Sequence, residues 1–385
     1  MRKSLPGECI NGCARVCTIE APCKINLHLG IGEKRSDGFH TLESIFATLA
    51  FCDTLRFECT EKEGDSTLLM NWEIPEEPIL PSKNLVMQAV SLFRERTNYK
   101  KGLKIAVTKR IPAGAGLGGG SSDAASSLLA LNLLAGTALP IEKLMEMAAT
   151  LGSDVPFFLS GGAAYVGGRG ESIEPVEIRR KLWVILCKPP FAVSTSFAFR
   201  ALDQVRESQA SEKSFKLNPF DGFPKETFPK QDVLKKTLSK KDISKKDVSR
   251  KRFSKKDVSK KRLIQALADD PKTWPFYNDF LTVFSGLDIK EKIKEPDLWA
   301  TSHSGVYQAI LRALDEAGAS FTGLSGSGSC CFGVFGSKTD AEKAEKVLNG
   351  DKFRSFLSSL GLSEQENFVR LTFFLARKTD PVLQY

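Results

Sequence analysis

The chain contains, at residues 112–122, the stretch Pro112-Ala113-Gly114-Ala115-Gly116-Leu117-Gly118-Gly119-Gly120-Ser121-Ser122. It follows an apolar run at 103–107, which predicts a strand, and precedes an Ala/Leu-rich segment at 123–135, which predicts a helix. Glycine lets the backbone adopt conformations that other residues avoid, so its N–H groups can converge on an anion. The positive end of the following helix dipole would point at the same place. We therefore expect this loop to bind the phosphates of a nucleotide.

The loop differs from the commonest phosphate-binding motifs. A Walker loop requires a lysine after its second glycine, but Gly120 occupies that position. The dinucleotide pattern Gly-x-Gly-x-x-Gly fits Gly114, Gly116 and Gly119, yet Pro140 stands where an acidic residue is expected. The motifs of protein kinases are absent from the sequence. An ordinary glycine-rich turn before a packed helix stays open as an alternative.

Three segments together resemble the motifs of the GHMP kinases, the family that includes galactokinase, homoserine kinase and mevalonate kinase. Residues 112–122 resemble the second motif, residues 21–27 (Ala-Pro-Cys-Lys-Ile-Asn-Leu) the first, and residues 324–329 (Leu-Ser-Gly-Ser-Gly-Ser) the third. Residues 37–42 (Asp-Gly-Phe-His-Thr-Leu) and 151–158 (Leu-Gly-Ser-Asp-Val-Pro-Phe-Phe) favour the branch that acts on 4-diphosphocytidyl-2-C-methyl-D-erythritol. The resemblance is close over residues 18–200 and looser over 270–380.

The resemblance implies an α+β fold, the two-domain GHMP kinase fold. We expect an extension at 1–14 and an ATP-binding N-terminal domain at 15–176, which would contain a left-handed β-α-β unit, an exception to the usual hand. A ferredoxin-like C-terminal domain would follow at 177–385. The active site would lie in the cleft between the two domains. Residues at about 205–265 have no counterpart in the family and would form an insertion in the C-terminal domain.

Lys24 and Asp154 match the catalytic lysine and aspartate of the family. A carboxylate within reach of an alcohol can accept its proton, and a nearby ammonium can stabilise the developing alkoxide. Taken alone, Asp154 would suit the N-cap of a helix beginning at Val155, because aspartate is a preferred cap residue. The two roles are compatible.

The nucleotide implied by the resemblance is ATP, with Mg²⁺ as the cofactor. Loop 112–122 would hold the phosphates, and the positions of Asn84 and Lys109 lie on the adenine side in the family. Ser121 and Ser122 could bind phosphate or Mg²⁺, although helix capping also explains them, so the metal ligands stay unassigned. Asp123 stands where the branch often has asparagine, and its charge would lie close to the phosphates.

The acceptor implied by the resemblance is a small molecule that carries a cytidine diphosphate group. The positions of Phe39, His40 and Phe199 stack on or hydrogen-bond the cytosine in the family, and that of Asn26 contacts the substrate. Phe39 replaces the more usual tyrosine, which keeps the stacking face and loses a hydroxyl. As isolated residues, both phenylalanines would suit a core and His40 a structural role.

Length and composition fit two domains. The chain has 385 residues, of which 42% are hydrophobic. No apolar run reaches the roughly 18 residues of a membrane helix, and no secretory signal follows the basic N-terminus. Nine cysteines, an odd number in a long chain, favour reduced thiols and a cytoplasmic location. Cys9, Cys13 and Cys17 are spaced by four, but no histidine lies close, and a ragged extension explains them better than a metal site.

A pentapeptide repeat at 239–263, with units such as Ser-Lys-Lys-Asp-Val, carries the positive charge. Residues 235–262 hold 14 Lys/Arg and three Asp, a balance of +11, whereas the whole chain has +9. Apolar residues at every fifth position do not line up on one face of a helix or on one face of a strand. We favour a tolerated loop insertion, since such loops cost little stability. Binding of nucleic acid or another polyanion stays open as the alternative.

We therefore expect ATP-dependent phosphorylation of the 2-hydroxyl of 4-diphosphocytidyl-2-C-methyl-D-erythritol, a step of the non-mevalonate isoprenoid pathway. One alternative is another GHMP kinase that acts on mevalonate, homoserine or a sugar. The other is an inactive kinase scaffold that binds polyanions through 235–262, against which the retention of Lys24 and Asp154 argues. We expect neither a membrane nor a nucleic acid as the main partner, and the oligomeric state stays open.

Overall fold

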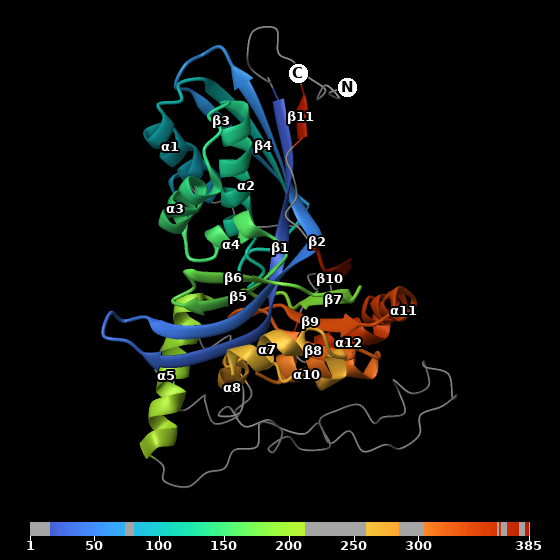
Figure 1. The fold of residues 1–385 in the computed structure, drawn as a ribbon. Coiled ribbons are helices and arrows are strands. Elements are labelled where there is room, and N and C mark those ends of the chain that lie inside the picture. The colour runs from blue at the N-terminus through green and yellow to red at the C-terminus, as the bar shows by residue number, and fades with distance from the viewer. Residues whose placement is uncertain are drawn as a thin grey trace, which may run out of the picture.

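The structure is a computed structural model, and it describes residues 16–73, 81–211, 259–284, 304–359, 362, 368–376 and 382–384. These residues form two β-sheets with helices packed on them (Figure 1). The expected extension at 1–14, with Cys9 and Cys13, lies outside this set, and so does most of the basic repeat. Cys17 is buried in the first strand. Among the helices of the described ranges, none is long and apolar enough to cross a membrane.

The larger sheet is built on two long strands, β1 (Val16–Lys34) and β2 (His40–Thr60). Apolar patterns predict separate short strands at 16–20, 25–31, 44–51 and 54–57. Instead, β1 and β2 are continuous and pair antiparallel along their whole length. The pairing register shifts at a few points, such as between Pro22 and Cys23. The shifts are bulges that absorb the irregular stretches, so each strand continues. The sheet order is β11-β1-β2-β4-β3, with β5 beside β2 and β6 beside β5. These further strands are β3 (Ser66–Trp72), β4 (Gly102–Lys109), β5 (Ala163–Gly168), β6 (Ser172–Val176) and β11 (Val382–Gln384).

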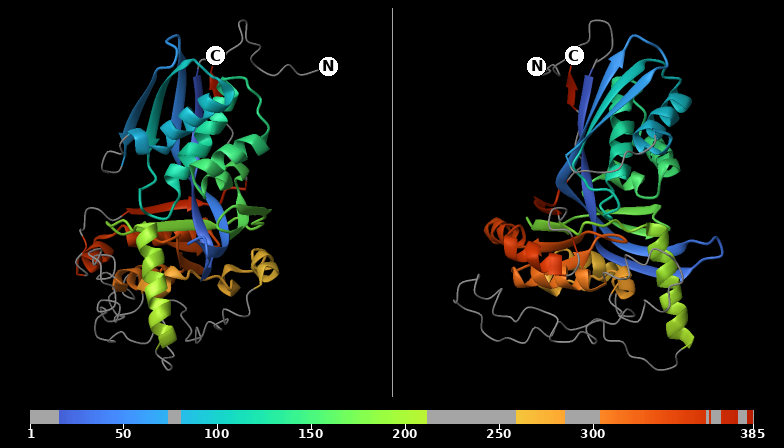
Figure 2. Two further views of the ribbon diagram at one scale, coloured as in Figure 1. Left: turned by 90° about the vertical axis from the view of Figure 1, so that its left-hand side faces the viewer. Right: turned by 180° about the vertical axis from the view of Figure 1, so that it is seen from behind.

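Four helices cover one face of this sheet (Figures 1 and 2). They are α1 (Leu85–Thr97), α2 (Gly119–Leu134), α3 (Ile141–Leu151) and α4 (Val155–Ser160). Their apolar faces and the strands form one buried cluster in which Phe57 and Phe93 are fully enclosed. β3 and β4 are parallel and are joined through the short turn η1 (Pro81–Lys83) and α1. The left hand expected for this β-α-β unit stays a prediction.

The smaller sheet has the order β10-β7-β9-β8, and all its strand pairs are antiparallel. Its strands are β7 (Trp183–Lys188), β8 (Phe321–Leu324), β9 (Cys331–Phe335) and β10 (Phe368–Phe373). α10 (Ser304–Glu316) precedes β8, and α11 (Lys338–Leu348) and α12 (Asp351–Ser359) precede β10. This β-α-β-β-α-β order is ferredoxin-like. The prediction of an α+β fold with a ferredoxin-like second part is therefore confirmed, whereas the domain boundary near residue 177 stays a prediction.

The tip of the β1–β2 hairpin is anchored against α5 (Thr195–Ser211) and α8 (Phe280–Phe284). Ile31 N donates to Asp279 Oδ2 at 2.9 Å, and Arg206 donates to Ile31 O at 2.6 Å. These contacts hold residues of the larger sheet against helices that belong to the smaller one. They fix the two halves of the candidate site relative to each other.

The end of the basic repeat is part of the folded protein. Its last unit, 259–263, begins α7 (Lys260–Ala266), which is followed by the short turn η3 (Pro271–Thr273). Ser259 caps α7 by accepting from Arg262 N, and Leu263 is fully buried. Lys260 Nζ pairs with Glu174 Oε2 at 2.5 Å. Residues 235–258, for which polyanion binding is the alternative prediction, lie outside the described ranges.

Candidate active site

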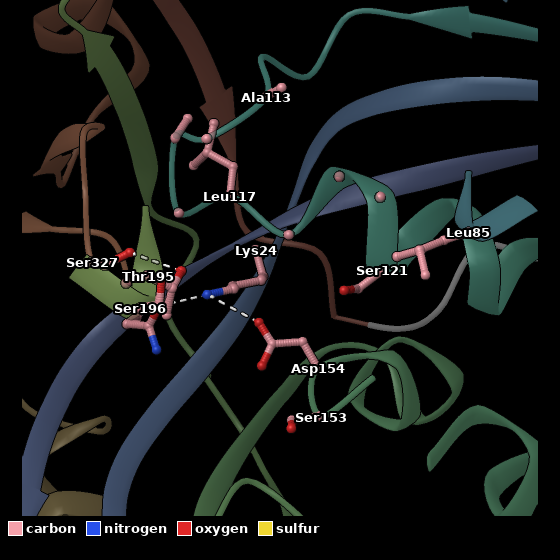
Figure 3. A pocket seen from close by; sticks show the side chains of 18 of the residues that line it. Lys24, Leu85, Ala113, Leu117, Ser121, Ser153, Asp154, Thr195, Ser196 and Ser327 are labelled. Carbon is pink, nitrogen blue, oxygen red and sulfur yellow. Dashed lines mark hydrogen bonds and ion pairs between the residues drawn. The ribbon is translucent and has the colours of Figure 1, made fainter. Parts of the chain in front are cut away.

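A cavity of about 880 Å³ brings most of the predicted site residues together. It is lined by loop 112–121 and by residues of β1, β2, α1, α5 and the start of α4 (Figure 3). Gly326 and Ser327, from the loop after β8, line it as well. The cavity therefore lies among segments of both sheets, at the place expected for the active site.

The glycine loop takes a shape that only glycine adopts easily. Gly114, Gly116 and Gly118 have φ values of +58°, +74° and +71°, in the left-handed region. A Cβ on Gly116 would overlap the Ser325 carbonyl oxygen, so this position also needs glycine for close approach. The loop is thus specified by both backbone conformation and packing.

Helix α2 begins inside the glycine stretch, at Gly119, which is earlier than the predicted start at 123. Its N-cap residue is Gly118, which has no side chain to cap the helix. The first intrahelical bond runs from Ser122 N to Gly118 O at 2.9 Å. The N–H groups at 119–121 precede this bond and lack intrahelical acceptors, as at every helix start. Together with the helix dipole, they form an anion site that faces the cavity.

The loop after β8 packs on the carbonyl side of the glycine loop. Ser325 Oγ donates to Gly116 O at 2.8 Å, and Cys330 N donates to Ala115 O at 3.1 Å. Asn278 Nδ2 donates to Leu324 O and to Gly326 O, each at 2.8 Å. The residues that resemble the third motif therefore brace the second motif and occupy its acceptors. Residues 119–121, whose N–H groups precede the first intrahelical bond, line the cavity.

Lys24 and Asp154 face each other at the floor of the cavity, as Figure 3 shows. Lys24 Nζ lies 3.5 Å from Asp154 Oδ2 and donates to Asn26 Oδ1 at 2.7 Å. Asn26 in turn donates to Ser44 Oγ at 3.0 Å, so the amide is fixed with its oxygen toward the ammonium. Asp154 stands at the N-cap position of α4, but its side chain makes no capping bond. Its carboxylate, about one-third exposed, remains available to a ligand.

Lys109 is buried between two carboxylates. Its Nζ binds Asp53 Oδ2 and lies 2.6 Å from Asp123 Oδ2. Asp53 Oδ1 also accepts from the N–H groups of Arg110 and Ile111. Burial raises the pKa of Asp123 to about 7, because the charge of Lys109 offsets the desolvation only in part and Asp53 opposes ionisation. This cluster joins the residues just before the glycine loop to the first turns of α2.

The residues predicted to lie on the nucleotide side have structural contacts of their own. Asn84 caps α1 by accepting from Val86 N at 2.9 Å, and it also lines the cavity. Ser121 lines the cavity, whereas Ser122 is buried and its Oγ has no hydrogen-bond partner among the residues that the structure describes. Ser122 is the one residue of 112–122 that does not line the cavity. The adenine-side roles of Asn84 and Lys109 stay predictions.

Phe39, His40 and Phe199, the residues predicted for the cytosine, also line the cavity. The rings of His40 and Phe199 are stacked with centroids 5.1 Å apart and an interplanar angle of 23°. Phe39 is 56% exposed, and the Arg169 guanidinium lies over its ring at 5.4 Å. An exposed aromatic ring at a cavity mouth is suited to stack on a flat ligand.

Several cavity residues carry no sequence signal. Asp203 lies on α5 and binds His40, and Thr195 Oγ1 lies 3.2 Å from Ser327 Oγ, so it joins α5 to the loop after β8. Asp53 and Asp203 are isolated acidic residues whose partners are distant in sequence. No spacing rule brings them to the site, because only the strand register and the packing of α5 do so.

The comparisons with known proteins agree with this geometry. Residues 84–162 match the family model described as "GHMP kinases N terminal domain", and residues 300–354 match "GHMP kinases C terminal". The chain is 32% identical over 334 residues to a 4-diphosphocytidyl-2-C-methyl-D-erythritol kinase of Thermodesulfovibrio yellowstonii, covering 86% of this chain and 94% of that one. It is 44% identical over 185 residues to the kinase of the same description from Bacillus subtilis, covering 48% and 62%.

Solved structures show the same fold. A crystal structure of a 4-(cytidine 5'-diphospho)-2C-methyl-D-erythritol kinase superposes with a TM-score of 0.60 and 26% sequence identity, covering 93% of this chain and 99% of that one. Homoserine kinase from Cytophaga hutchinsonii gives a TM-score of 0.57 at 15% identity, covering 99% and 100%. The second likeness concerns the fold alone.

Proposed function

The chain belongs to the family of 4-diphosphocytidyl-2-C-methyl-D-erythritol kinases, within the GHMP kinases, and from this premise we propose how its residues carry out the reaction. The reaction transfers the γ-phosphoryl group of ATP to the 2-hydroxyl of 4-diphosphocytidyl-2-C-methyl-D-erythritol. The observation that carries the proposal is the pair of Lys24 and Asp154, held beside the start of α2.

Asp154 acts as the general base in this proposal. Its uncapped carboxylate accepts the proton of the 2-hydroxyl, and the oxygen attacks the γ-phosphorus as the bond to the ADP oxygen breaks. Lys24, fixed by Asn26, stabilises the alkoxide charge that develops and keeps the carboxylate oriented. Because Lys24 is 4% exposed, its charge is screened little by water.

Loop 112–122 and the start of α2 bind the ATP phosphates in this proposal. The free N–H groups at 119–121 and the helix dipole favour the negative charge, as at other helix N-termini. Mg²⁺, when bound with ATP, neutralises part of the phosphate charge. In the parts of the chain that the structure describes, no group of three or more His, Cys, Asp or Glu could hold a metal ion. Mg²⁺ is usually held by one or two carboxylates together with phosphate oxygens and water, and its protein ligands stay unassigned here.

The acceptor binds at the opposite end of the cavity, with its cytosine at Phe39, His40 and Phe199 and its erythritol near Asn26. Distance along the cavity thus separates the base from the reacting hydroxyl. Remote binding energy of this kind positions the hydroxyl for attack. We further expect the enzyme to act in the cytoplasm, as its composition indicates.

The direct test combines Mg-ATP with single acceptors and follows ADP release. The cytidine-bearing acceptor should be phosphorylated efficiently. Efficient turnover of mevalonate, homoserine or a sugar instead would favour the alternative GHMP kinases. Absence of transfer to every acceptor, together with tight retention on polyanions, would favour the inactive scaffold.

A further inference from the structure

The turn between β5 and β6 brings an arginine to the cavity. Leu42 of β2 pairs with Gly168 at the end of β5, so the turn lies beside the start of β2. Arg169, in this turn, lines the cavity, and its guanidinium lies over the exposed ring of Phe39, 5.4 Å from the ring centroid. A guanidinium in this position is attracted by the electrons of the aromatic face. The charge of Arg169 is therefore held at one wall of the cavity.

The backbone of this turn is closely specified. Gly168 and Gly170 have φ values of +69° and +116°, in the region that favours glycine. Glu171 folds back over the turn, and its Oε2 accepts from Arg169 N at 2.5 Å. The pKa of Glu171 is lowered, first by a hydrogen bond from its own backbone N–H and further by that from Arg169 N. The carboxylate nearest in sequence to Arg169 is thus ionised and occupied by backbone donors.

The guanidinium of Arg169 has no acidic partner at ion-pair distance among the described residues, although other cations around the cavity do. Lys24 pairs with Asp154, and Lys34 pairs with an aspartate of α5. Arginine stays protonated at all ordinary pH values, and its N–H donors form a rigid fork that matches the oxygens of a phosphate. Arg169 is therefore suited to an anionic ligand in the cavity.

The same turn also contacts the segment that carries the proposed general base. A Cβ on Gly170 would lie 3.4 Å from Ser153 Cβ, and Ser153 directly precedes Asp154 (Figure 3). The turn therefore reaches from the ring of Phe39 to the start of α4. In the proposed complex, the cytosine lies at Phe39 and the reacting hydroxyl at Asp154. The diphosphate joins these two groups of the acceptor, so it passes the wall at which Arg169 lies.

Resting on the function proposed above, we propose that Arg169 binds the diphosphate of the acceptor and makes the enzyme select an acceptor that carries this charge. The guanidinium donates to phosphate oxygens while its face stays on the ring of Phe39. Because the diphosphate connects the cytosine to the erythritol, holding it limits where the 2-hydroxyl can lie relative to Asp154. The phosphates of ATP lie at the start of α2 in the proposed complex and are not ligands of Arg169.

The kinetic test uses the full chain with Mg-ATP and the cytidine acceptor. Arg169→Met keeps a long side chain and removes the charge and the donors. It should raise KM for the acceptor about tenfold, the lower end of the range for hydrogen bonds to charged groups, because Arg169 is exposed to water. Arg169→Lys keeps the charge and loses the fork, so its KM should lie between the two. KM for ATP should stay unchanged in both variants, and a rise in KM for ATP alone would overturn the proposal.

A second measurement isolates the diphosphate from the cytosine. CDP and cytidine are each tested as inhibitors against the acceptor at saturating Mg-ATP. CDP should inhibit the unaltered enzyme more strongly than cytidine does. Arg169→Met should weaken inhibition by CDP about tenfold and leave inhibition by cytidine unchanged. A distorted cytosine pocket would instead weaken both inhibitors equally, and this result would contradict the role of Arg169.

Arg35→Met is the matched control, because it removes the same charge from the neighbouring β1–β2 turn. Arg35 pairs with Asp37 at 3.0 Å and is not among the described residues that line the cavity. Its replacement should leave KM for the acceptor and inhibition by CDP nearly unchanged. If Arg35→Met had the same effects as Arg169→Met, general surface charge would explain them, and the proposed role of Arg169 would be wrong.

The two proposals fail in different ways. If the unaltered enzyme phosphorylates the cytidine acceptor and Arg169→Met does so with the same KM, the role of Arg169 is refuted while the proposed function stands. If the unaltered enzyme does not phosphorylate this acceptor, the proposed function fails and the role of Arg169 falls with it.

Discussion

The ammonium of Lys24 lies 3.5 Å from the carboxylate of Asp154, although one residue sits on a central strand and the other precedes a short helix. Lys24 is held by Asn26, and its backbone N–H donates to Leu117 O at 2.8 Å. The glycine loop and the proposed catalytic pair are therefore joined by a direct backbone contact. A substitution in the glycine loop should therefore alter the position of Lys24, and a substitution at Lys24 should alter the loop.

Asp154→Ala should lower kcat about 10²-fold or more, because that is the usual contribution of a general base. Lys24→Ala should also reduce kcat more than it raises KM for ATP. Asp154→Asn preserves shape without basicity and should be as inactive as Asp154→Ala. The measurement is steady-state kinetics, with circular dichroism to verify the fold. Turnover near that of the unaltered enzyme in folded Asp154→Ala would rule out the assignment.

Gly116→Ala should raise KM for ATP about tenfold or more. An alanine at φ +74° costs roughly 1–2 kcal/mol, and its Cβ would also push against Ser325, so the loop must shift. Gly64→Ala is the matched control, because Gly64 has φ +73° and nothing within 4 Å of the added Cβ. It should lower stability by a similar conformational cost and leave KM for ATP unchanged. Equal effects of the two variants on KM would contradict the role of close packing.

Asp123→Asn should become more stable relative to the unaltered protein as the pH rises from about 5 to 8. The native pKa of Asp123 is raised to about 7, above its usual value, so the folded state binds this proton more tightly than the unfolded state does. The contribution of Asp123 to stability is therefore complete at low pH and falls as the pH rises toward 7. Asparagine does not titrate. Urea unfolding of both proteins at several pH values measures the difference, and a constant difference would show that Asp123 does not titrate there.

Deleting residues 235–256 should leave kcat, KM and the melting temperature nearly unchanged. The deletion stops before Ser259, which caps α7, and before the buried Leu263. Retention on a polyanion column should lose its dependence on salt, because most of the basic charge is gone. By contrast, Leu263→Ala within the last repeat unit should cost about 2–5 kcal/mol. Loss of activity in the folded deletion variant would mean that the segment contributes to the site.

The conformation of the glycine loop could be predicted from its local sequence, whereas Lys24 was singled out only through the resemblance to the GHMP kinases. The unusual density of glycine at 112–120 has few structural explanations, and the apolar segments around it set the strand and helix. Helix α2 begins earlier than the sequence predicts, because glycine has a low helix propensity in general, whereas here its backbone is needed at the helix start.

The second layer of the site could not be predicted in the same way. Asp53 reaches Lys109 because β2 pairs with β4 in one particular register, and Asp203 reaches His40 because α5 packs on the hairpin tip. Strand β11 joins β1 from the far end of the chain, and a run of three residues there has no distinct pattern. Long-range packing decides these contacts, and single-sequence patterns do not encode it.

The central claim is tested most directly by kcat/KM for two acceptors with Mg-ATP: 4-diphosphocytidyl-2-C-methyl-D-erythritol and methylerythritol phosphate without the cytidine group. We expect efficient transfer to the first and very poor transfer to the second, because binding of the cytosine in the proposed pocket would position the reacting hydroxyl. His40→Ala should raise KM for the first acceptor and leave KM for ATP nearly unchanged. Equal efficiency with both acceptors would contradict the proposed cytosine pocket, and preferred turnover of mevalonate would contradict the proposed function.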